Sequence, residues 1–207
     1  MDPKALYSLS YGVFMLAVSD GGKVNGCITN TCMQVASSPT RLAISCLNSN
    51  LTCEMLKNSG RFTLSILDST CTFETIKHFG LQSGRTVNKF EDLELPTDAA
   101  GTPYLSWATC AVISCHVTQA MDLGSHTMFI AEIDDAFRCS DNPPLTYADY
   151  QSRLKPKTGG SAPAPKKIVG WRCKICQYEY KGPELPADFL CPLCGHDASD
   201  FEPIYEA

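Results

Sequence analysis

The fold of the C-terminal part is decided by Trp171-Arg-Cys173-Lys-Ile-Cys176 and, further on, Phe189-Leu-Cys191-Pro-Leu-Cys194-Gly195. The four cysteines follow the pattern C-x2-C-x14-C-x2-C. A C-x2-C pair in a tight turn aims two sulfurs at one point, and two facing turns give a tetrahedral site of four thiolates. That geometry suits zinc or a single iron. We therefore expect a metal site rather than two disulfides, with Cys173, Cys176, Cys191 and Cys194 as its ligands.

Residues 168–207 depend on that metal for folding, because roughly 40 residues cannot build a sufficient apolar core unaided. They carry three basic and seven acidic groups, a net charge of −4. A zinc ribbon that binds nucleic acid needs Lys and Arg residues around the metal site. The acidity therefore argues against nucleic acid, and a zinc ribbon that binds a protein partner stays open as an alternative.

A linker precedes this module. Residues 155–167 read Lys155-Pro-Lys-Thr-Gly-Gly-Ser-Ala-Pro-Ala-Pro-Lys-Lys167 and contain no large apolar residue. Such a mixture of Pro, Gly and Lys favours an extended tether over a packed element. We therefore divide the chain into residues 1–154, the linker 155–167 and residues 168–207.

The overall composition is that of a globular protein. The 207 residues allow at most two domains, and 44% apolar with 19% charged residues exclude a wholly disordered chain. A net charge of −5 argues against a general binder of nucleic acid or anionic membranes. No apolar run approaches the roughly 18 residues of a membrane span. We read no signal peptide, so we expect a cytoplasmic protein in which the twelve cysteines are reduced thiols or metal ligands.

Residues 1–154 are predicted to be mainly β with short helices. Asp20-Gly-Gly-Lys23 predicts a hairpin turn, and Asn50 and Gly60 predict the two ends of a helix. A second helix is expected to end near Gly80, and a short one to cover residues 2–9. Strands are expected over residues 13–19, 24–35, 41–47, 61–67, 108–120 and 127–137. This spacing favours a closed or partly closed barrel over a parallel α/β sheet.

Eight further cysteines are scattered between Cys27 and Cys139. Cys27 and Cys32 are five positions apart in a predicted strand, as are Cys110 and Cys115. Residues at that spacing face opposite sides of a strand, so neither pair is expected to share a metal. We expect most of the eight to pack as small apolar core residues.

The C-terminal module resembles rubredoxin over residues 168–204. The resemblance rests on the aromatic Trp171 before the first cysteine, on Tyr178 and Tyr180 after the second, and on Cys191-Pro-Leu-Cys-Gly195 and Phe201-Glu-Pro. The segment between the cysteine pairs is about half the usual rubredoxin length, as in short rubredoxin-like domains attached to other redox proteins. The resemblance implies one iron held by four thiolates, which carries one electron and no proton. Zinc is the alternative.

The N-terminal module looks like the flavin reductase family. The segments that carry this resemblance are Tyr11–Ser19, Asn25–Gln34, Ser38-Pro39, Phe79–Arg85, Lys89-Phe90 and Gly124–Ile133. The family implies an FMN-binding split β-barrel, usually a homodimer with FMN at the subunit interface. The fusion of the two modules is similar to the high-molecular-weight rubredoxins of anaerobic prokaryotes.

The resemblance assigns cofactor-binding roles to several polar segments. Strand alternation puts Thr29 and Thr31 on one face with Asn30 opposite, where short polar side chains suit ribityl hydroxyls and the ring edge. Ordinary strand residues are the alternative. The flavin ring is expected against the segment after the third strand. That segment is Ser45, Cys46, Leu47 and Asn48, and Gln34 joins Thr29, Asn30 and Thr31 among the other expected cofactor-binding residues.

The phosphate of FMN is expected at the start of the helix that Asn50 and Thr52 open, because a helix N-terminus favours anions. Ser83 and Gly84 supply a second contact, with Arg85 as the charge partner. The alternatives are that Asn50 and Thr52 only cap the helix and that Arg85 is a solvated surface residue.

His126 follows Gly124-Ser125, where the family often has Gly-Asp-His, and is expected near the nicotinamide or flavin. A half-buried turn histidine is the alternative. Ser125 stands where the family often has Asp, and this departure motivates the alternative of a carrier that does not use NAD(P)H.

The resemblance implies an NAD(P)H-dependent oxidoreductase. NAD(P)H would reduce FMN, which would pass single electrons to the iron centre and on to a redox partner such as a flavodiiron oxygen or nitric oxide reductase. No catalytic side chain is named, because the cofactor carries the chemistry of hydride transfer. Two alternatives remain: an electron carrier of flavoredoxin type that does not use NAD(P)H, and a flavin reductase with a zinc-ribbon interaction module.

Overall fold

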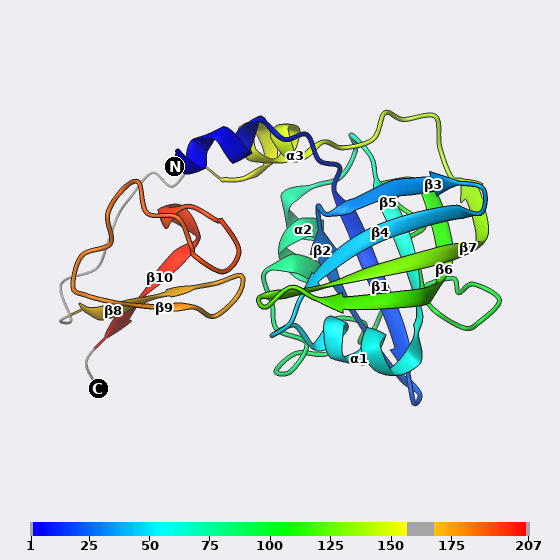
Figure 1. Cartoon of the computed structure of the whole chain (residues 1–207), viewed down its shortest axis with the longest axis horizontal. Coiled ribbons are helices and arrows are strands. Elements are labelled where there is room, and N and C mark those ends of the chain that lie inside the picture. Colours follow the sequence, from blue (N-terminus) through cyan, green and yellow to red (C-terminus); the bar gives the residue numbers. More distant parts are fainter. Residues whose placement is uncertain (1, 157–167, 206–207) are drawn as a thin grey trace. The chain divides into compact units, whose positions relative to one another are not determined.

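The computed structural model describes residues 2–156 and 168–205 and divides into two compact units, Met1–Lys155 and Pro156–Ala207 (Figure 1). Of the predicted linker 155–167, all but Lys155 and Pro156 lie outside the described residues. Among residues 2–156 and 168–205, no helix is both long enough and apolar enough to cross a membrane.

The first unit is built on one seven-stranded antiparallel sheet (Figure 1). The strand order is β2-β1-β5-β6-β7-β4-β3. The strands are β1 (Phe14–Asp20), β2 (Lys23–Thr29), β3 (Cys32–Ser37), β4 (Thr40–Leu47), β5 (Arg61–Leu67), β6 (Thr109–Asp122) and β7 (His126–Arg138). The helices are α1 (Leu51–Ser59), α2 (Phe73–Gly80), α3 (Tyr147–Asp149), the 3-10 helix η1 (Pro3–Ser8) and the π-helix η2 (Tyr150–Leu154).

Local signals predicted several element ends correctly. Gly21 and Gly22 have φ values of 55° and 79° in the β1–β2 turn, a conformation that glycine adopts without strain. The side chain of Asn50 accepts a hydrogen bond from the Thr52 N–H at the start of α1, and Gly60 ends the helix in the left-handed region with φ 65°. These predictions are confirmed.

The prediction of a single strand over residues 24–35 is wrong. The chain leaves β2 at Thr29 and enters β3 at Cys32, and these two strands lie at opposite edges of the sheet. Only Asn30 and Thr31 separate the two strands, so the two edges of the sheet meet at this crossover, where the Thr29 hydroxyl of β2 donates to the Ser45 carbonyl of β4 over 3.4 Å. The sheet thereby curls into a barrel, as predicted, and the two residues between the strands join its edges.

Two apolar clusters stabilise the unit. Leu16, Ile44, Leu64 and Phe129 belong to one cluster with α1, and a second cluster gathers Met15, Phe79 and Leu105 with α2. Successive residues of β1 pack into different clusters, so this strand is buried on both faces and its sequence is continuously apolar. Most scattered cysteines were expected in the core, and this is confirmed for five: Cys27, Cys46, Cys53, Cys71 and Cys115 are buried.

The second unit has a three-stranded antiparallel sheet in the order β10-β8-β9. The strands are β8 (Ile168–Cys173), β9 (Glu179–Lys181) and β10 (Phe201–Tyr205), with the 3-10 helix η3 (Ala198–Asp200) before β10. Phe189 packs edge-on against Tyr180 and Phe201, with ring centroids 4.8 and 5.4 Å apart. This aromatic group is a small core that leaves the two cysteine turns to be closed by a metal.

Candidate redox sites

The four cysteine sulfurs of the second unit converge on one point. All four lie within 4.8 Å of one another, and Cys173, Cys176 and Cys191 are buried while Cys194 is half-buried. The Cys173 and Cys194 sulfurs are 3.6 Å apart, and those of Cys176 and Cys191 are 3.3 Å apart. Four thiolates each about 2.3 Å from a shared ion would be separated by similar distances. The site therefore fits a tetrahedral metal.

The two cysteine turns have equivalent backbones. In the first, the Gln177 N–H donates to the Cys173 carbonyl over 2.9 Å, and in the second the Gly195 N–H donates to the Cys191 carbonyl over 2.8 Å. The residue after each second cysteine is left-handed, with φ 65° at Gln177 and 73° at Gly195. The equivalence of the turns explains how two sequence-separated pairs aim their sulfurs at one point.

The surroundings of Cys173 favour its thiolate. Hydrogen bonding from the Cys176 thiol, then from that of Cys194, lowers the pKa of the Cys173 thiol, and backbone N–H groups of Cys176 and Ile175 add to the effect. Metal ligation needs the deprotonated thiol. N–H groups directed at sulfur also tune the potential of an iron held there.

Thr29 and Thr31 lie together at the barrel closure. Their hydroxyl oxygens are 3.0 Å apart, and the Thr31 hydroxyl donates to the Ser45 carbonyl over 2.8 Å. Asn30, between them, is half-buried. Gln34 lies on the exposed strand β3, where its side-chain amide donates to the Ala36 carbonyl over 3.1 Å. The structure thus brings the predicted threonines to the end of β4, and it holds Gln34 within its own strand.

The predicted phosphate residues also converge. Asn50 caps α1, and Thr52 in its first turn is fully buried, with its hydroxyl accepting a hydrogen bond from Asn25 Nδ2 over 3.0 Å. A Cβ placed on Gly84 would overlap the Asn25 side chain, so the loop that carries Gly84 lies directly against Asn25. Asn25 therefore links the loop to the start of α1.

Arg85 is the charged residue of this loop. Its Nη2 donates to Glu54 Oε2 over 2.8 Å, and both side chains are about half exposed. Because Glu54 is in the first turn of α1, the guanidinium lies beside the helix N-terminus. An arginine and a helix N-terminus together suit a phosphate monoester.

Asn48 has its side chain committed to the β6–β7 turn. Its Nδ2 donates to Gly124 O over 2.7 Å and to Asp122 Oδ1 over 3.2 Å, and its Oδ1 accepts from the Thr127 hydroxyl over 2.6 Å. Lys57 Nζ donates to the same oxygen over 3.3 Å. The side chain is fully used within the chain, and the backbone N–H of Asn48 donates to the Ser125 carbonyl over 2.9 Å, so neither group is left for a flavin ring edge.

His126 begins β7 directly beside that turn. It is half-buried, its Nδ1 is 2.8 Å from the Ser125 hydroxyl, and burial lowers the pKa of its imidazole below 6.5. The register pairs it with Leu47, and it pairs Ser45 with Met128 on the same outer face of the sheet. Cys46, between them, points into the core and is 3% exposed. The predicted ring-binding segment thus presents Ser45, Leu47 and His126 on one surface.

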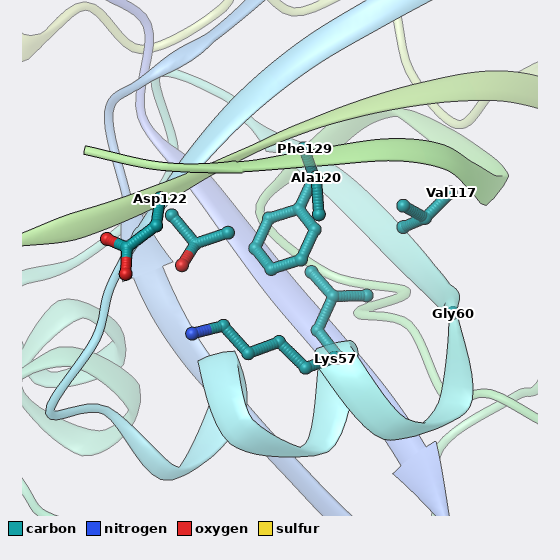
Figure 2. A pocket seen from close by; sticks show the side chains of 8 residues that line it. Lys57, Gly60, Val117, Ala120, Asp122 and Phe129 are labelled. Carbon is teal, nitrogen blue, oxygen red and sulfur yellow. The ribbon is translucent and has the colours of Figure 1, made fainter. Parts of the chain in front are cut away.

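A cavity of about 490 Å³ lies between α1 and the β6–β7 hairpin (Figure 2). Lys57 and Asp122 lie at the same end of it, with Phe129 and Val117 among its apolar walls. None of the residues predicted for cofactor binding lines this cavity. It adjoins the predicted ring-binding segment, because Asn48 hydrogen-bonds to Lys57, Asp122 and Thr127 of its lining.

Sequence reasoning gave no role to three residues that shape the site. Asn25 links loop and helix, Glu54 pairs with Arg85, and Lys89 is buried beneath the loop. Asn25 and Lys89 fall within the segments that resemble the flavin reductase family, and that was the signal available. Their roles depend on contacts between segments far apart in the chain.

The geometry defines a class of protein: a flavin-type barrel joined to a four-thiolate metal module, which is an electron-transfer arrangement. Residues 6–155 match the model of the flavin reductase like domain, and residues 171–202 match that of the rubrerythrin, rubredoxin-like domain. The chain belongs to the flavin reductase family and carries a rubredoxin-like domain.

Two curated relatives are similar to this chain, one over almost its whole length and one over about three quarters of it. The chain is 32% identical to a high molecular weight rubredoxin of Moorella thermoacetica, in an alignment covering 99% of this chain and 100% of the relative. It is 37% identical to a ferric-chelate reductase (NAD(P)H) of Archaeoglobus fulgidus, covering 78% of this chain and 96% of the relative. The NADH:FAD oxidoreductase SgcE6 of Streptomyces globisporus has the same fold, with a TM-score of 0.62 at 20% identity over 69% of this chain and 84% of that one.

The predicted fold class and family are therefore confirmed. The chain is an electron-transfer oxidoreductase, and its redox cofactors are a flavin and an iron. The individual flavin contacts stay predictions.

Proposed function

We propose that this chain takes electrons from NAD(P)H into FMN, passes them singly to the iron, and delivers them to a redox protein of flavodiiron type that reduces dioxygen or nitric oxide. The single observation that carries the proposal is the presence, in one chain, of a flavin reductase barrel and a convergent four-thiolate site. A flavin can exchange two electrons with a nicotinamide and one with an iron, so the pair of cofactors converts one kind of transfer into the other.

The residues of the barrel hold and orient the flavin. Arg85 and the start of α1 would bind the phosphate, Thr29 and Thr31 the ribityl chain, and the backbone after Ser45 the polar ring edge. His126 borders the ring face on which a nicotinamide would lie. Its lowered pKa keeps the imidazole neutral at pH 7, so it would offer a hydrogen bond rather than a charge.

We also propose that the chain acts as a homodimer through the outer face of β3, β4, β7 and β6. The register aligns Met33, Ala43 and Ile130 in one row and Ser45, Met128 and Met121 in the next. Met33 and Met121 are 60% and 57% exposed. An exposed apolar face of this kind supports an interface. The row that follows holds Leu47 and His126, so a partner on this face would cover the ring-binding segment.

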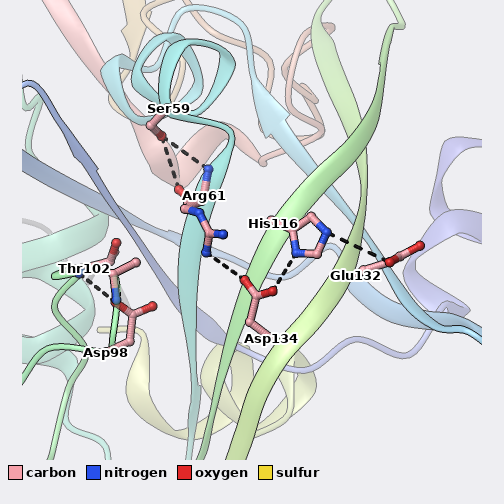
Figure 3. A network of polar contacts seen from close by, with 8 residues as sticks. Ser59, Arg61, Asp98, Thr102, His116, Glu132 and Asp134 are labelled. Carbon is pink, nitrogen blue, oxygen red and sulfur yellow. Dashed lines mark hydrogen bonds and ion pairs between the residues drawn. The ribbon is translucent and has the colours of Figure 1, made fainter.

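A charged row borders the apolar rows on the other side. Figure 3 shows its members His116 and Glu132, together with Asp134 and Arg61. Arg41, Glu132 and His116 are paired across β4, β7 and β6, and Arg41 Nη2 lies 2.8 Å from Glu132 Oε1. Asp134 joins His116 Nδ1 at 2.7 Å to Arg61 Nη1 at 2.9 Å. Charges that satisfy one another at the border of an apolar patch suit the polar rim of an interface.

Anaerobic titration of the purified holoprotein with NADH and with NADPH tests the electron donor. Bleaching of the flavin by either nucleotide supports the proposal, whereas no bleaching by either supports a carrier of flavoredoxin type. Metal analysis should find iron at the four cysteines, and zinc there would contradict the electron relay, because it would leave a flavin reductase with an interaction module. Reduction of a ferric chelate is assayed as the alternative to reduction of a protein acceptor, because one relative is named for that activity.

Partner and location belong to the same proposal. The steady-state rate of NAD(P)H oxidation should rise when a flavodiiron protein and its oxidant are added. If a ferric chelate is reduced faster than the flavodiiron protein, the ferric chelate replaces the flavodiiron protein as the proposed acceptor. The twelve cysteines, all free among the described residues, suit the reducing cytoplasm.

A further inference from the structure

Lys89 is the most deeply buried cation among the residues of the first unit whose burial the structure describes. It is 2% exposed, and its Nζ donates to the Gly26 carbonyl over 2.9 Å and to the Phe79 carbonyl over 2.8 Å. Burial lowers the pKa of the ammonium group. Burying a lysine is costly, and one ammonium that satisfies two carbonyls recovers part of that cost. The flavin chemistry described above does not use this residue.

The contacts of Lys89 close a loop at its base. Phe79 is near the C-terminal end of α2, where carbonyls lack helical partners, and Lys89 supplies one. In return, the Lys89 carbonyl lies 2.6 Å from Nε2 of His78 on α2. Residues 80–88 therefore form a loop whose two ends are joined, and this loop carries Ser83, Gly84 and Arg85.

The same ammonium also joins the loop to the barrel. The Gly26 carbonyl belongs to β2, and the residue before it, Asn25, contacts Gly84 and hydrogen-bonds Thr52 of α1. The base of the loop and its middle are thus held on two successive residues of one strand. The Arg85 guanidinium then reaches Glu54 in the first turn of α1.

We infer that Lys89 is a positioning residue for the phosphate end of the flavin site: it seats the 80–88 loop on β2 and so keeps Arg85 beside the start of α1. This inference rests on the proposed binding of FMN. It separates two roles for cations at the site, because Arg85 would contact the phosphate while Lys89, which is buried, acts only through the loop.

The test compares FMN with riboflavin, which lacks the phosphate, on flavin-free whole protein. The ratio of their dissociation constants measures the preference for the phosphate. A general folding defect weakens both ligands alike and leaves this ratio unchanged. The variants are Arg85→Ala, Lys89→Met, the double variant, and Lys77→Met as a matched control, since Lys77 is an exposed lysine of α2 paired only with Glu74 among the ion pairs of the described residues.

We expect Arg85→Ala to reduce the preference for FMN by about 10- to 150-fold, the value of one charge-assisted contact. Lys89→Met should reduce it by at least about tenfold, with riboflavin binding within about threefold of wild type. The double variant should resemble Arg85→Ala, because two residues that act through one contact are not additive. Lys77→Met should resemble wild type.

The inference is overturned if folded Lys89→Met keeps the wild-type preference for FMN over riboflavin. It is also overturned if the double variant loses this preference by the product of the two single-variant factors. If Arg85→Ala leaves the preference unchanged, the phosphate assignment itself fails and the inference fails with it. If Lys89→Met does not fold, Gly84→Ala moves the same loop off Asn25 with Lys89 in place. It must then show the same selective loss of FMN, and an unchanged preference overturns the inference.

Discussion

The hydroxyl of Thr29 lies 3.0 Å from that of Thr31, although the strands on either side of these residues lie at opposite edges of the sheet. Both hydroxyls face the carbonyl of Ser45 on β4, at 3.4 and 2.8 Å. The barrel is therefore closed by side chains at the point where the flavin ribityl chain is predicted to bind. The proposed ribityl contacts would therefore use the same two residues that close the barrel.

Replacing Thr31 by Val should lower the free energy of unfolding by about 1 kcal/mol, because the Ser45 carbonyl loses a hydrogen-bond donor. Thr40→Val is the matched control, since the Thr40 hydroxyl donates to the carbonyl of Ser37 at an exposed turn. Urea unfolding of both variants measures the difference. Equal small losses would show that the barrel closure does not depend on the Thr31 hydroxyl.

Replacing Glu54 by Gln should strengthen FMN binding by up to about fivefold, because an exposed ion pair is worth about 0–1 kcal/mol and its removal frees Arg85 for a phosphate. Riboflavin binding should not change. Glu74→Gln, at the equivalent first turn of α2, is the control. Weaker FMN binding in Glu54→Gln would mean that the ion pair holds Arg85 in its binding position.

His126 should make the protein less stable in acid. Burial lowers the pKa of the folded imidazole below the 6.5 of the unfolded chain, so the unfolded state binds more protons in this range. Stability should therefore fall as the pH drops below 6.5. Unfolding free energies at pH 8 and pH 5 should differ more in wild type than in His126→Gln. An equal difference in both would place the acid sensitivity elsewhere.

Substitutions at the left-handed residue of the two cysteine turns should change the stability of the metal site in opposite directions. Gly195→Ala should destabilise its turn by about 1–2 kcal/mol through the left-handed backbone alone, because no atom lies within 4 Å of the added Cβ. Gln177→Gly should relieve the same strain in the first turn and slow the loss of metal to a chelator. Loss of iron absorbance with time measures both. Faster loss from Gln177→Gly would contradict the equivalence of the turns.

Short-range features of this fold could be predicted from sequence because their causes are local. Gly21 and Gly22 need positive φ, Asn50 and Gly60 bound a helix, and the four cysteines follow a spacing with one geometric meaning. The break between β2 and β3 could not be predicted in this way. Residues 24–35 read as one continuous strand, and the change of sheet edge depends on β4 meeting Thr31 from elsewhere in the chain.

The roles of several site residues could not be predicted for the same reason, because they depend on contacts with distant parts of the chain. The side chain of Asn48 is an excellent hydrogen-bonding group, and the sequence does not show that the β6–β7 turn, more than 70 residues later, uses all of it. Nothing in the residues next to Lys89 predicts that its side chain is buried with the carbonyls of Gly26 in β2 and Phe79 in α2 as its partners. Polar residues whose partners are distant in sequence are the ones whose roles only the fold reveals.

Anaerobic stopped-flow absorbance of the holoprotein mixed with NADH or NADPH tests the central claim most directly. With one of the nucleotides, the flavin band should bleach first and the ferric band should then decay, at a rate that does not change over a tenfold range of protein concentration, because both cofactors belong to one assembly. Cys173→Ser, without the iron, should show the flavin step alone. A ferric band that stays oxidised beside a reduced flavin, or that decays in proportion to protein concentration, would contradict the relay.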